Sequence, residues 1–248
     1  MKAAEIKTIG VIPARLGSTR LAEKVLKPIA GRPMIQHVWE RARQARELDD
    51  LIVACDDDRI LACVEGFGGK ALMTRVDHPN GSSRVAEVAG RVQADVVINI
   101  QGDEPMMHPE GIDKLVKVFR EDAKIQVATL AVPKNNSEDY ENPNVVKVIC
   151  DAQGNALYFS RSPIPFYREK PAAGISFLKH LGVYGYRRDF LLQFVTWKPG
   201  VLEDKEKLEQ LRILEKGFSI RVIETVQDSW SVDTAEDLAL VEKKLTVR

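Results

Sequence analysis

The chain has 248 residues, of which 44% are hydrophobic and 29% are charged, and its 36 basic residues balance its 36 acidic residues. This length suffices for one large α/β domain or for a domain with a smaller insertion. The zero net charge and the lack of a basic run exclude an ordinary nucleic-acid or membrane-surface binder, so we expect a small-molecule partner.

Cysteine usage and hydropathy indicate where the protein works. Cys55, Cys63 and Cys150 are odd in number and lack C-x-x-C spacing, which argues against a disulfide framework and a zinc knuckle. The opening residues MKAAEIK show no apolar signal-peptide segment, and no stretch approaches the length of a membrane span. We therefore expect a cytoplasmic protein.

The first predicted strand, Ile9–Ile12, leads into a loop that carries three cations, Arg15, Arg20 and Lys24. Ligands bind α/β sheets at the carboxyl ends of strands, and a bound anion offsets concentrated positive charge. We predict a polyphosphate cradle here, and a merely solvated charged loop is the alternative. The patterns G-x-x-x-x-G-K-[ST] and G-x-G-x-x-G are absent, which argues against a P-loop NTPase and a dinucleotide-dependent dehydrogenase.

A helix is predicted from Pro33 to about Ala42, followed by the strand Leu51–Cys55. The three acids at positions 56–58 resemble a metal site, but helix capping explains them better. After a strand at 70–74, the loop Asp77–Arg84 contains Gly81 and two serines. These residues either present polar groups to a base or phosphate, or simply start a helix.

The stretch Asp95–Pro105 predicts a buried strand followed by the polar residues Gln101, Asp103 and Glu104. The βαβαβαβ succession predicts a doubly wound parallel sheet, and in a 3-2-1-4 order its first and fourth strands are neighbours. Asp103 would then face the cationic loop across one crevice. That arrangement suits a magnesium-bound polyphosphate, and a plain salt bridge is the alternative.

The elements predicted after residue 105 change in pattern from Asn142 onward, where an antiparallel section is expected. The predicted elements are a helix from Pro109, a strand at 125–132, a hairpin around the turn 151–155, a return strand at 177–186, one helix at 205–217, a strand at 219–226 and a helix with a capping-box-like start at Thr234 and Asp237. We therefore divide a single domain into a nucleotide-binding α/β portion (1–132), an inserted antiparallel portion (133–186) and a C-terminal α/β portion (187–248).

Seven motifs in order, spread over nearly the whole chain, resemble the cytidylyltransferases that activate 3-deoxy-manno-octulosonate (Kdo). They are IPARLGSTRL (12–21), NIQGDEP (99–105), NPNVVKV (142–148), ALYFSRSPIP (156–165), KHLGVYGYR (179–187), LEQLR (208–212) and VDTAEDL (232–238). The resemblance implies a GT-A/Rossmann-like nucleotide-diphospho-sugar transferase fold with a mostly parallel sheet. It also implies Mg2+-dependent transfer of CMP from CTP to Kdo for lipopolysaccharide biosynthesis, and a homodimer formed through the antiparallel portion.

The resemblance also implies roles for individual residues. Those assigned to nucleotide binding are Arg15, Ser18, Arg20, Lys24, Gly81, Ser82, Arg84 and Gln101, and of these Arg15 and Lys24 act in catalysis with Asp103. The magnesium carboxylates are Asp103 and Asp233. The residues assigned to the sugar acid are Gln101, Arg161, His180, Tyr184, Glu209 and Gln210, and an arginine there would suit the carboxylate of the substrate.

Three segments depart from the family's pattern. The pattern RLPGK appears as residues 20–24, RLAEK, which puts Glu23 beside the cradle lysine. S-G-T-[DE]-R appears as residues 80–84, NGSSR, in the loop expected to contact cytosine. G-x-G-V-D-T appears as residues 229–234, SWSVDT, in which Trp230 replaces a small residue. Two alternatives therefore stay open: a cytidylyltransferase for another sugar acid, such as 8-amino-Kdo or sialic acid, and a non-catalytic nucleotide-binding homologue.

Overall fold

The computed structural model describes residues 6–17, 21–169 and 174–246. Its strands are β1 (Thr8–Ala14), β2 (Pro28–Ile29), β3 (Arg32–Pro33), β4 (Asp50–Cys55), β5 (Lys70–Met73), β6 (Val96–Asn99), β7 (Val127–Lys134), β8 (Lys147–Cys150), β9 (Ala156–Ser160), β10 (Phe177–Arg187) and β11 (Arg221–Glu224). Its helices are η1 (Lys24–Leu26), α1 (Met34–Ala42), α2 (Asp58–Gly66), α3 (Gly81–Arg91), α4 (Pro109–Glu121), α5 (Ser137–Glu141), α6 (Arg188–Phe194), α7 (Val201–Glu206), α8 (Leu211–Glu215) and α9 (Ala235–Thr246).

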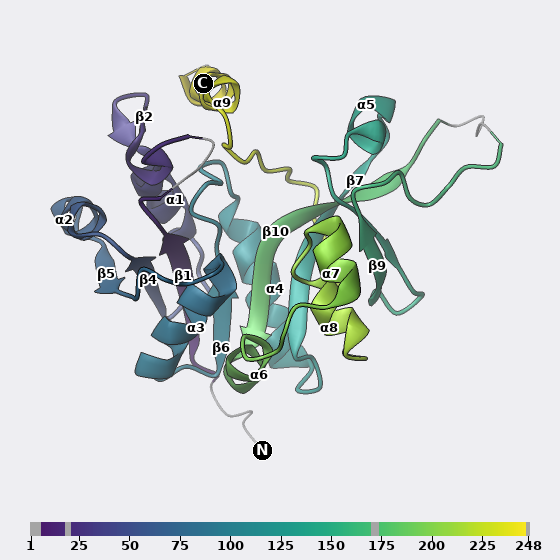
Figure 1. Cartoon of the computed structure of the whole chain (residues 1–248), viewed down its shortest axis with the longest axis horizontal. Helices are drawn as coiled ribbons and strands as arrows, with labels where there is room; N and C mark the ends of the chain where they lie inside the picture. The colour runs from purple at the N-terminus through teal and green to yellow at the C-terminus, as the bar shows by residue number, and fades with distance from the viewer. Residues whose placement is uncertain (1–5, 18–20, 170–173, 247–248) are drawn as a thin grey trace.

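Among the described residues, nine strands form one mixed sheet in the order β11-β7-β10-β6-β1-β4-β5, in which β8 also pairs with β10, and β9 pairs with β8 (Figure 1). The half β5-β4-β1-β6 is parallel and has the predicted 3-2-1-4 order. The α/β fold class with a mainly parallel sheet is therefore confirmed. Since β1 and β6 are neighbours, the loops that follow them lie side by side.

The other half of the sheet contains the antiparallel elements. The hairpin of β8 and β9 is present as predicted, and the return strand β10 runs antiparallel between β6 and β7. The register of β10 against β7 shifts between Leu181 and Tyr184, so the strand carries a bulge there. Thus the last strand of the inserted portion is an integral part of the main sheet, next to the strand that precedes Asp103.

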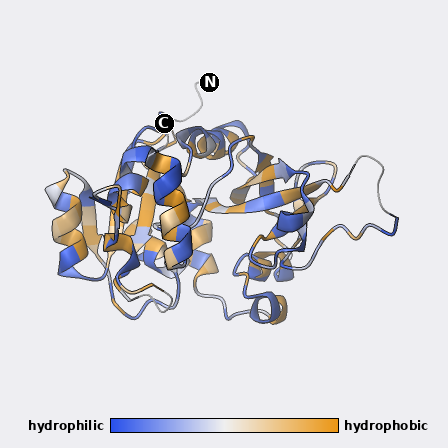
Figure 2. Ribbon diagram, turned by 90° about the horizontal axis from the view of Figure 1, so that it is seen from above, coloured by the Kyte–Doolittle hydropathy of each residue, from blue (hydrophilic) through white to orange (hydrophobic). Residues whose placement is uncertain are grey.

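Helices cover both faces of the sheet. Successive residues of β1 point to opposite faces, so Ile12 packs with α1, α2 and α4 on one side, and Val11 packs with α3, α6 and α8 on the other. Apolar residues concentrate along the strands, whereas the helices alternate apolar and polar residues (Figure 2). Among the described residues no helix is long and apolar enough to cross a membrane.

One local prediction is wrong and two are confirmed. The helix expected at 205–217 is two short helices, α7 and α8, because Lys207 has a φ of 53° and ends the first. The helix start that the sequence allowed at 81–84 is present, because these residues form the first turn of α3 and the side chain of Asn80 accepts a hydrogen bond of 2.9 Å from the Ser83 N–H. A third prediction is confirmed, because Asp57 caps α2 through the Arg59 N–H.

Candidate functional site

A cavity of about 330 Å³, hereafter the nucleotide cavity, lies where β1 and β6 end. Its lining includes predicted site residues from four separate segments of the chain: Arg15, Lys24, Gly81, Arg84, Gln101, Asp103 and Asp233. The adjacency of β1 and β6 places the cationic loop opposite the segment after β6, as the sequence predicts. A volume of this order suits a small ligand.

Lys24 occupies the centre of this arrangement. Its Nζ lies 2.7 Å from Asp103 Oδ2 and 3.0 Å from Asp233 Oδ1. Burial alone would lower the pKa of Lys24, but the two carboxylates outweigh burial, and the pKa is raised. The Val232 N–H donates to the Asp103 carbonyl over 2.9 Å, which fastens the segment before α9 to the segment after β6. Three chain segments thus converge on one cation.

The pair Asp103 and Asp233 fits a magnesium ion. The two carboxylates already approach one cation, the ammonium of Lys24, which shows that they can share a positively charged ligand. Mg2+ is commonly held by one or two carboxylates together with substrate phosphates and water. Within the described residues no group of three His, Cys, Asp or Glu side chains converges as a metal site. The two carboxylates would therefore need oxygens from a bound nucleotide to complete a coordination shell.

The remaining nucleotide residues differ in what they contact. Arg15 is exposed and lines the cavity, and Gly81 lies at the start of α3. Ser18 and Arg20 lie outside the described residues. The Ser82 hydroxyl donates to Glu209 Oε2 over 2.7 Å, so it is directed toward the segment that leads into α8.

Arg84 is buried and already bonded. Its guanidinium donates to Asp56 Oδ2 over 2.9 Å and to the Thr74 hydroxyl over 2.6 Å. Asp56 also accepts the Leu16 N–H over 2.9 Å, which links the loop after β1 to α3. Asp56 is thus a structural anchor of the nucleotide cavity. Sequence analysis missed this role because it treated all three acids at 56–58 as caps.

A second cavity of about 540 Å³, hereafter the sugar cavity, adjoins the first. Gln101 lines both cavities, and its Nε2 donates to the Gly182 carbonyl over 3.0 Å at the bulge of β10. The predicted sugar-binding residues His180, Tyr184 and Gln210 also line it. The structure therefore brings four of the six predicted sugar-binding residues to one hollow beside Asp103.

His180 is held as a neutral imidazole. Burial lowers its pKa to about 3. The Thr129 hydroxyl donates to the Val183 carbonyl over 2.8 Å and lies 3.0 Å from His180 Nε2, so this hydroxyl is left to accept from an Nε2–H. The ring also contacts that of Tyr184, with 5.4 Å between centroids. His180 is thus oriented by its neighbours on β7 and β10.

Glu209 and Arg161 lie apart from the residues that line the sugar cavity. Glu209 accepts hydrogen bonds from Asn80 Nδ2 over 2.8 Å and from Ser82, and burial raises its pKa. Arg161 donates to the backbone carbonyls of Glu206 over 2.8 Å and Pro143 over 3.0 Å. In these positions Glu209 braces the start of α3, and Arg161 ties the end of β9 to α7.

Sequence analysis assigned no role to several other residues that line the sugar cavity. Asp228 accepts from Lys134 over 2.8 Å and from Lys179 over 2.7 Å, and these lysines lower its pKa although burial opposes them. Burial, helped by the charge of Asp103, raises the pKa of Glu104 to about 7. The motif QGDEP is a local sequence signal that could have pointed to Glu104. No local pattern indicates that Asp228 pairs with two distant lysines.

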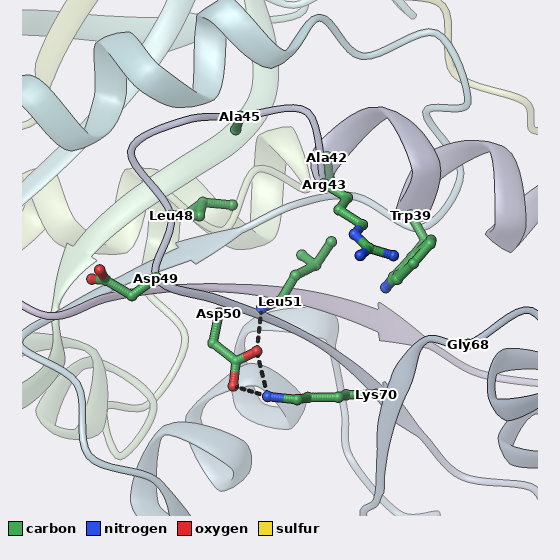
Figure 3. A pocket seen from close by; sticks show the side chains of 10 residues that line it. All are labelled: Trp39, Ala42, Arg43, Ala45, Leu48, Asp49, Asp50, Leu51, Gly68 and Lys70. Carbon is green, nitrogen blue, oxygen red and sulfur yellow. Dashed lines mark hydrogen bonds and ion pairs between the residues drawn. The ribbon is translucent and has the colours of Figure 1, made fainter.

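A further hollow lies at the other end of the parallel strands, where β4 and β5 begin (Figure 3). There the Lys70 ammonium bonds both carboxylate oxygens of Asp50 at 2.8 Å, and the Arg43 guanidinium lies 4.9 Å from the Trp39 ring centroid. These ionic groups satisfy one another. The lining of this hollow contains none of the predicted site residues.

Comparisons with known proteins agree with this geometry. A family model described as cytidylyltransferase matches residues 9–224. The chain is 48% identical over 244 residues to the 3-deoxy-manno-octulosonate cytidylyltransferase of Geobacter sulfurreducens, covering 95% of this chain and 98% of the relative. It is 52% identical over 239 residues to the protein of the same name from Syntrophobacter fumaroxidans, covering 95% and 96%.

Solved structures give the same result. A structure of CMP:2-keto-3-deoxy-manno-octonic acid synthetase complexed with CTP matches with a TM-score of 0.91 and 44% identity, covering 96% of this chain and 98% of that one. The 4-diphosphocytidyl-2C-methyl-D-erythritol synthase of Anaerococcus prevotii matches with a TM-score of 0.66 at 13% identity, over 97% and 99% of the two chains. The second likeness concerns the fold alone.

Proposed function

The chain belongs to the 3-deoxy-manno-octulosonate cytidylyltransferase family, and from this premise we propose that it transfers CMP from CTP to the anomeric hydroxyl of Kdo, releasing pyrophosphate. One observation carries the proposal at the level of the site. Lys24, Asp103 and Asp233 meet beside Gln101, the residue that the nucleotide cavity and the sugar cavity share. The two reactants would meet at this junction.

Arg15 and Lys24 would bind the triphosphate. Both line the nucleotide cavity, and a fixed cation near the transferred phosphate stabilises the charge that develops as pyrophosphate leaves. Triphosphate oxygens would compete with Asp103 and Asp233 for the Lys24 ammonium. Arg20 shares this predicted role but lies outside the described residues.

Asp103 and Asp233 would hold the magnesium ion that the family resemblance predicts. When bound, Mg2+ supplies electrophilic assistance at the phosphates and neutralises part of their charge. If the Lys24 ammonium bonded the triphosphate instead, both carboxylates would become free to bind the metal ion at the same time.

The sugar acid would occupy the sugar cavity. Gln101, Tyr184 and Gln210 offer hydrogen bonds from its walls, and His180 stays neutral there. The lining of this cavity already contains one carboxylate, Asp228, which is paired with two lysines. The carboxylate of the substrate would add a second negative charge beside these lysines. Glu209 and Arg161, which brace the surrounding elements, keep their predicted sugar roles as proposals.

We further propose a homodimer, a cytoplasmic location and a part in lipopolysaccharide biosynthesis. In the inserted portion the apolar side chains of Phe166 and Leu157 are 84% and 59% exposed, and a second copy of the chain could cover them. Sedimentation velocity would test the dimer, with Phe166→Ser as the variant expected to weaken it.

The function is tested by assaying pyrophosphate release and the CMP-sugar mass with CTP, Mg2+ and one sugar acid at a time. We expect the highest kcat/KM with Kdo. A higher value with 8-amino-Kdo or sialic acid would favour the alternative substrate. CTP binding without release from any of the three would favour a non-catalytic homologue.

A further inference from the structure

Four buried polar atoms without a hydrogen-bond partner line the sugar cavity. Six such side-chain atoms occur among the described residues, and the four that gather here are Glu104 Oε2, Tyr184 Oη, Gln210 Nε2 and Ser229 Oγ. Buried polar groups are normally bonded, because an unpaired one keeps its full cost of desolvation. Tyr184 and Gln210 already belong to the predicted sugar site, whereas Glu104 and Ser229 have no assigned role.

Glu104 is fixed beside the bulge of β10. The residue is 7% exposed, and a Cβ on Gly182 would lie 3.3 Å from its Oε1. The carbonyl of that same glycine accepts from Gln101, so Glu104 and Gln101 pack against one point of β10. The absence of a side chain at position 182 permits this close approach. Glu104 Oε2 is left as an acceptor in the wall of the cavity.

Ser229 is fixed through its backbone. Its N–H donates to Asp228 Oδ1 over 2.8 Å, and its carbonyl accepts from Lys179 Nζ over 3.2 Å. The residue is 6% exposed, and its hydroxyl lies close enough to Glu104 to oppose the rise in the pKa of that carboxyl, although it makes no hydrogen bond of regular geometry. Ser229 also stands where the family pattern G-x-G-V-D-T begins with glycine. This chain therefore adds a buried hydroxyl to the cavity wall relative to that pattern, and a second, exposed hydroxyl where Ser231 replaces the other glycine.

We propose that Glu104 and Ser229 determine specificity for the sugar acid by hydrogen-bonding hydroxyl groups of its carbon chain. This inference rests on the proposed function, since Kdo carries such hydroxyls at C4, C5, C7 and C8. A site built to bond a substrate hydroxyl rejects an analogue that lacks it, because the buried protein group then stays unpaired. The two residues thus select among sugar acids by the positions of the hydroxyl groups along the carbon chain.

The test uses the full-length protein with Kdo and with its four monodeoxy analogues at C4, C5, C7 and C8. The variants are Glu104→Gln and Ser229→Ala, and the matched control is Ser219→Ala, an exposed serine that lines neither the nucleotide cavity nor the sugar cavity. We expect each variant to lose about tenfold in kcat/KM for Kdo. We expect no loss for the analogue that lacks the bonded hydroxyl, and an unchanged KM for CTP.

Three results separate the possible failures. No pyrophosphate from the parent with Kdo would contradict the proposed function itself. An active parent whose two variants behave like Ser219→Ala would contradict the assignment of Glu104 and Ser229 alone. A loss that is equal on all five substrates, or a raised magnesium requirement in Glu104→Gln, would also overturn it, because it would show that these residues support Asp103 instead of reading the sugar.

Discussion

The ammonium of Lys24 lies 2.7 Å from the carboxylate of Asp103, although the two residues are 79 positions apart. Lys24 begins η1 in the loop after β1, and Asp103 follows β6, so the contact depends on the adjacency of these strands. Asp233 completes the group at 3.0 Å. The lysine thus bonds both carboxylates that we propose as magnesium ligands.

Replacing Lys24 by Met should separate its two roles. We expect Lys24→Met to bind Mn2+ about tenfold more tightly than the parent in the absence of nucleotide, because no ammonium competes for the carboxylates. The kcat for pyrophosphate release should fall about 10²- to 10³-fold, because a cation at the phosphates is lost. Manganese electron paramagnetic resonance and steady-state kinetics measure the two effects. Lys70→Met is the control, and unchanged Mn2+ affinity in Lys24→Met would contradict the competition.

Asp103→Asn should impair catalysis much more than folding. The Asp103 side chain is 30% exposed, and ion pairs of such exposure contribute about 1 kcal/mol or less to the free energy of unfolding. Loss of a metal-binding carboxylate should lower kcat about 10²-fold or more. Urea unfolding measures the free energy of unfolding, and steady-state kinetics at saturating Mg2+ measure kcat. A variant that keeps the parent rate would remove Asp103 from the metal site.

Glu23→Gly should stabilise the protein. Glu23 has a φ of 53°, a conformation that costs a residue with a side chain about 1–2 kcal/mol. Its compensation is an exposed ion pair with Arg59 at 2.7 Å, which contributes little because solvent screens both charges. We expect the free energy of unfolding to rise by about 0.5–1 kcal/mol. Ala22→Gly changes a neighbouring residue that has no positive φ, and it should lower the free energy of unfolding. An equal decrease in both variants would show that the backbone at Glu23 is not strained.

His180 should make the protein sensitive to acid. Its pKa is about 3 in the folded protein, because it is buried, and near 6.5 in the unfolded chain. Below pH 6.5 the unfolded state binds a proton that the folded state does not, so stability falls as the pH falls toward 3. At pH 5 this costs the parent about 2 kcal/mol of unfolding free energy. Urea unfolding at pH 7.5 and 5.0 should show a smaller fall in the free energy of unfolding for His180→Gln than for the parent. An equal fall in the two proteins would exclude this role of His180.

The parallel half of the fold and the opposition of Asp103 to the cationic loop could be predicted from the sequence. Apolar runs followed by turn residues mark β1, β4 and β6, and the chirality of crossover connections leaves few orders for their strands. The strand order then dictates which loops meet. Lys24 and Asp103 therefore followed from pattern and topology alone.

Other features depend on tertiary contacts that no local pattern encodes. The family resemblance assigned Arg161 to the carboxylate of the sugar acid, yet its guanidinium donates to the carbonyls of Glu206 and Pro143. The break between α7 and α8 rests on the backbone conformation of Lys207, which helical periodicity does not reveal. In the sequence, Ser229 is visible only as a serine in place of a pattern glycine. The structure shows that this serine is buried in the wall of the sugar cavity.

The most direct test of the account is pyrophosphate release by the purified protein with Kdo and Mg2+, run separately with CTP, UTP, ATP and GTP. The account predicts release with CTP, identified by the mass of CMP-Kdo, and little or none with the other three nucleotides. Release that is equal with UTP, or the absence of release with CTP while CTP still binds, would contradict it.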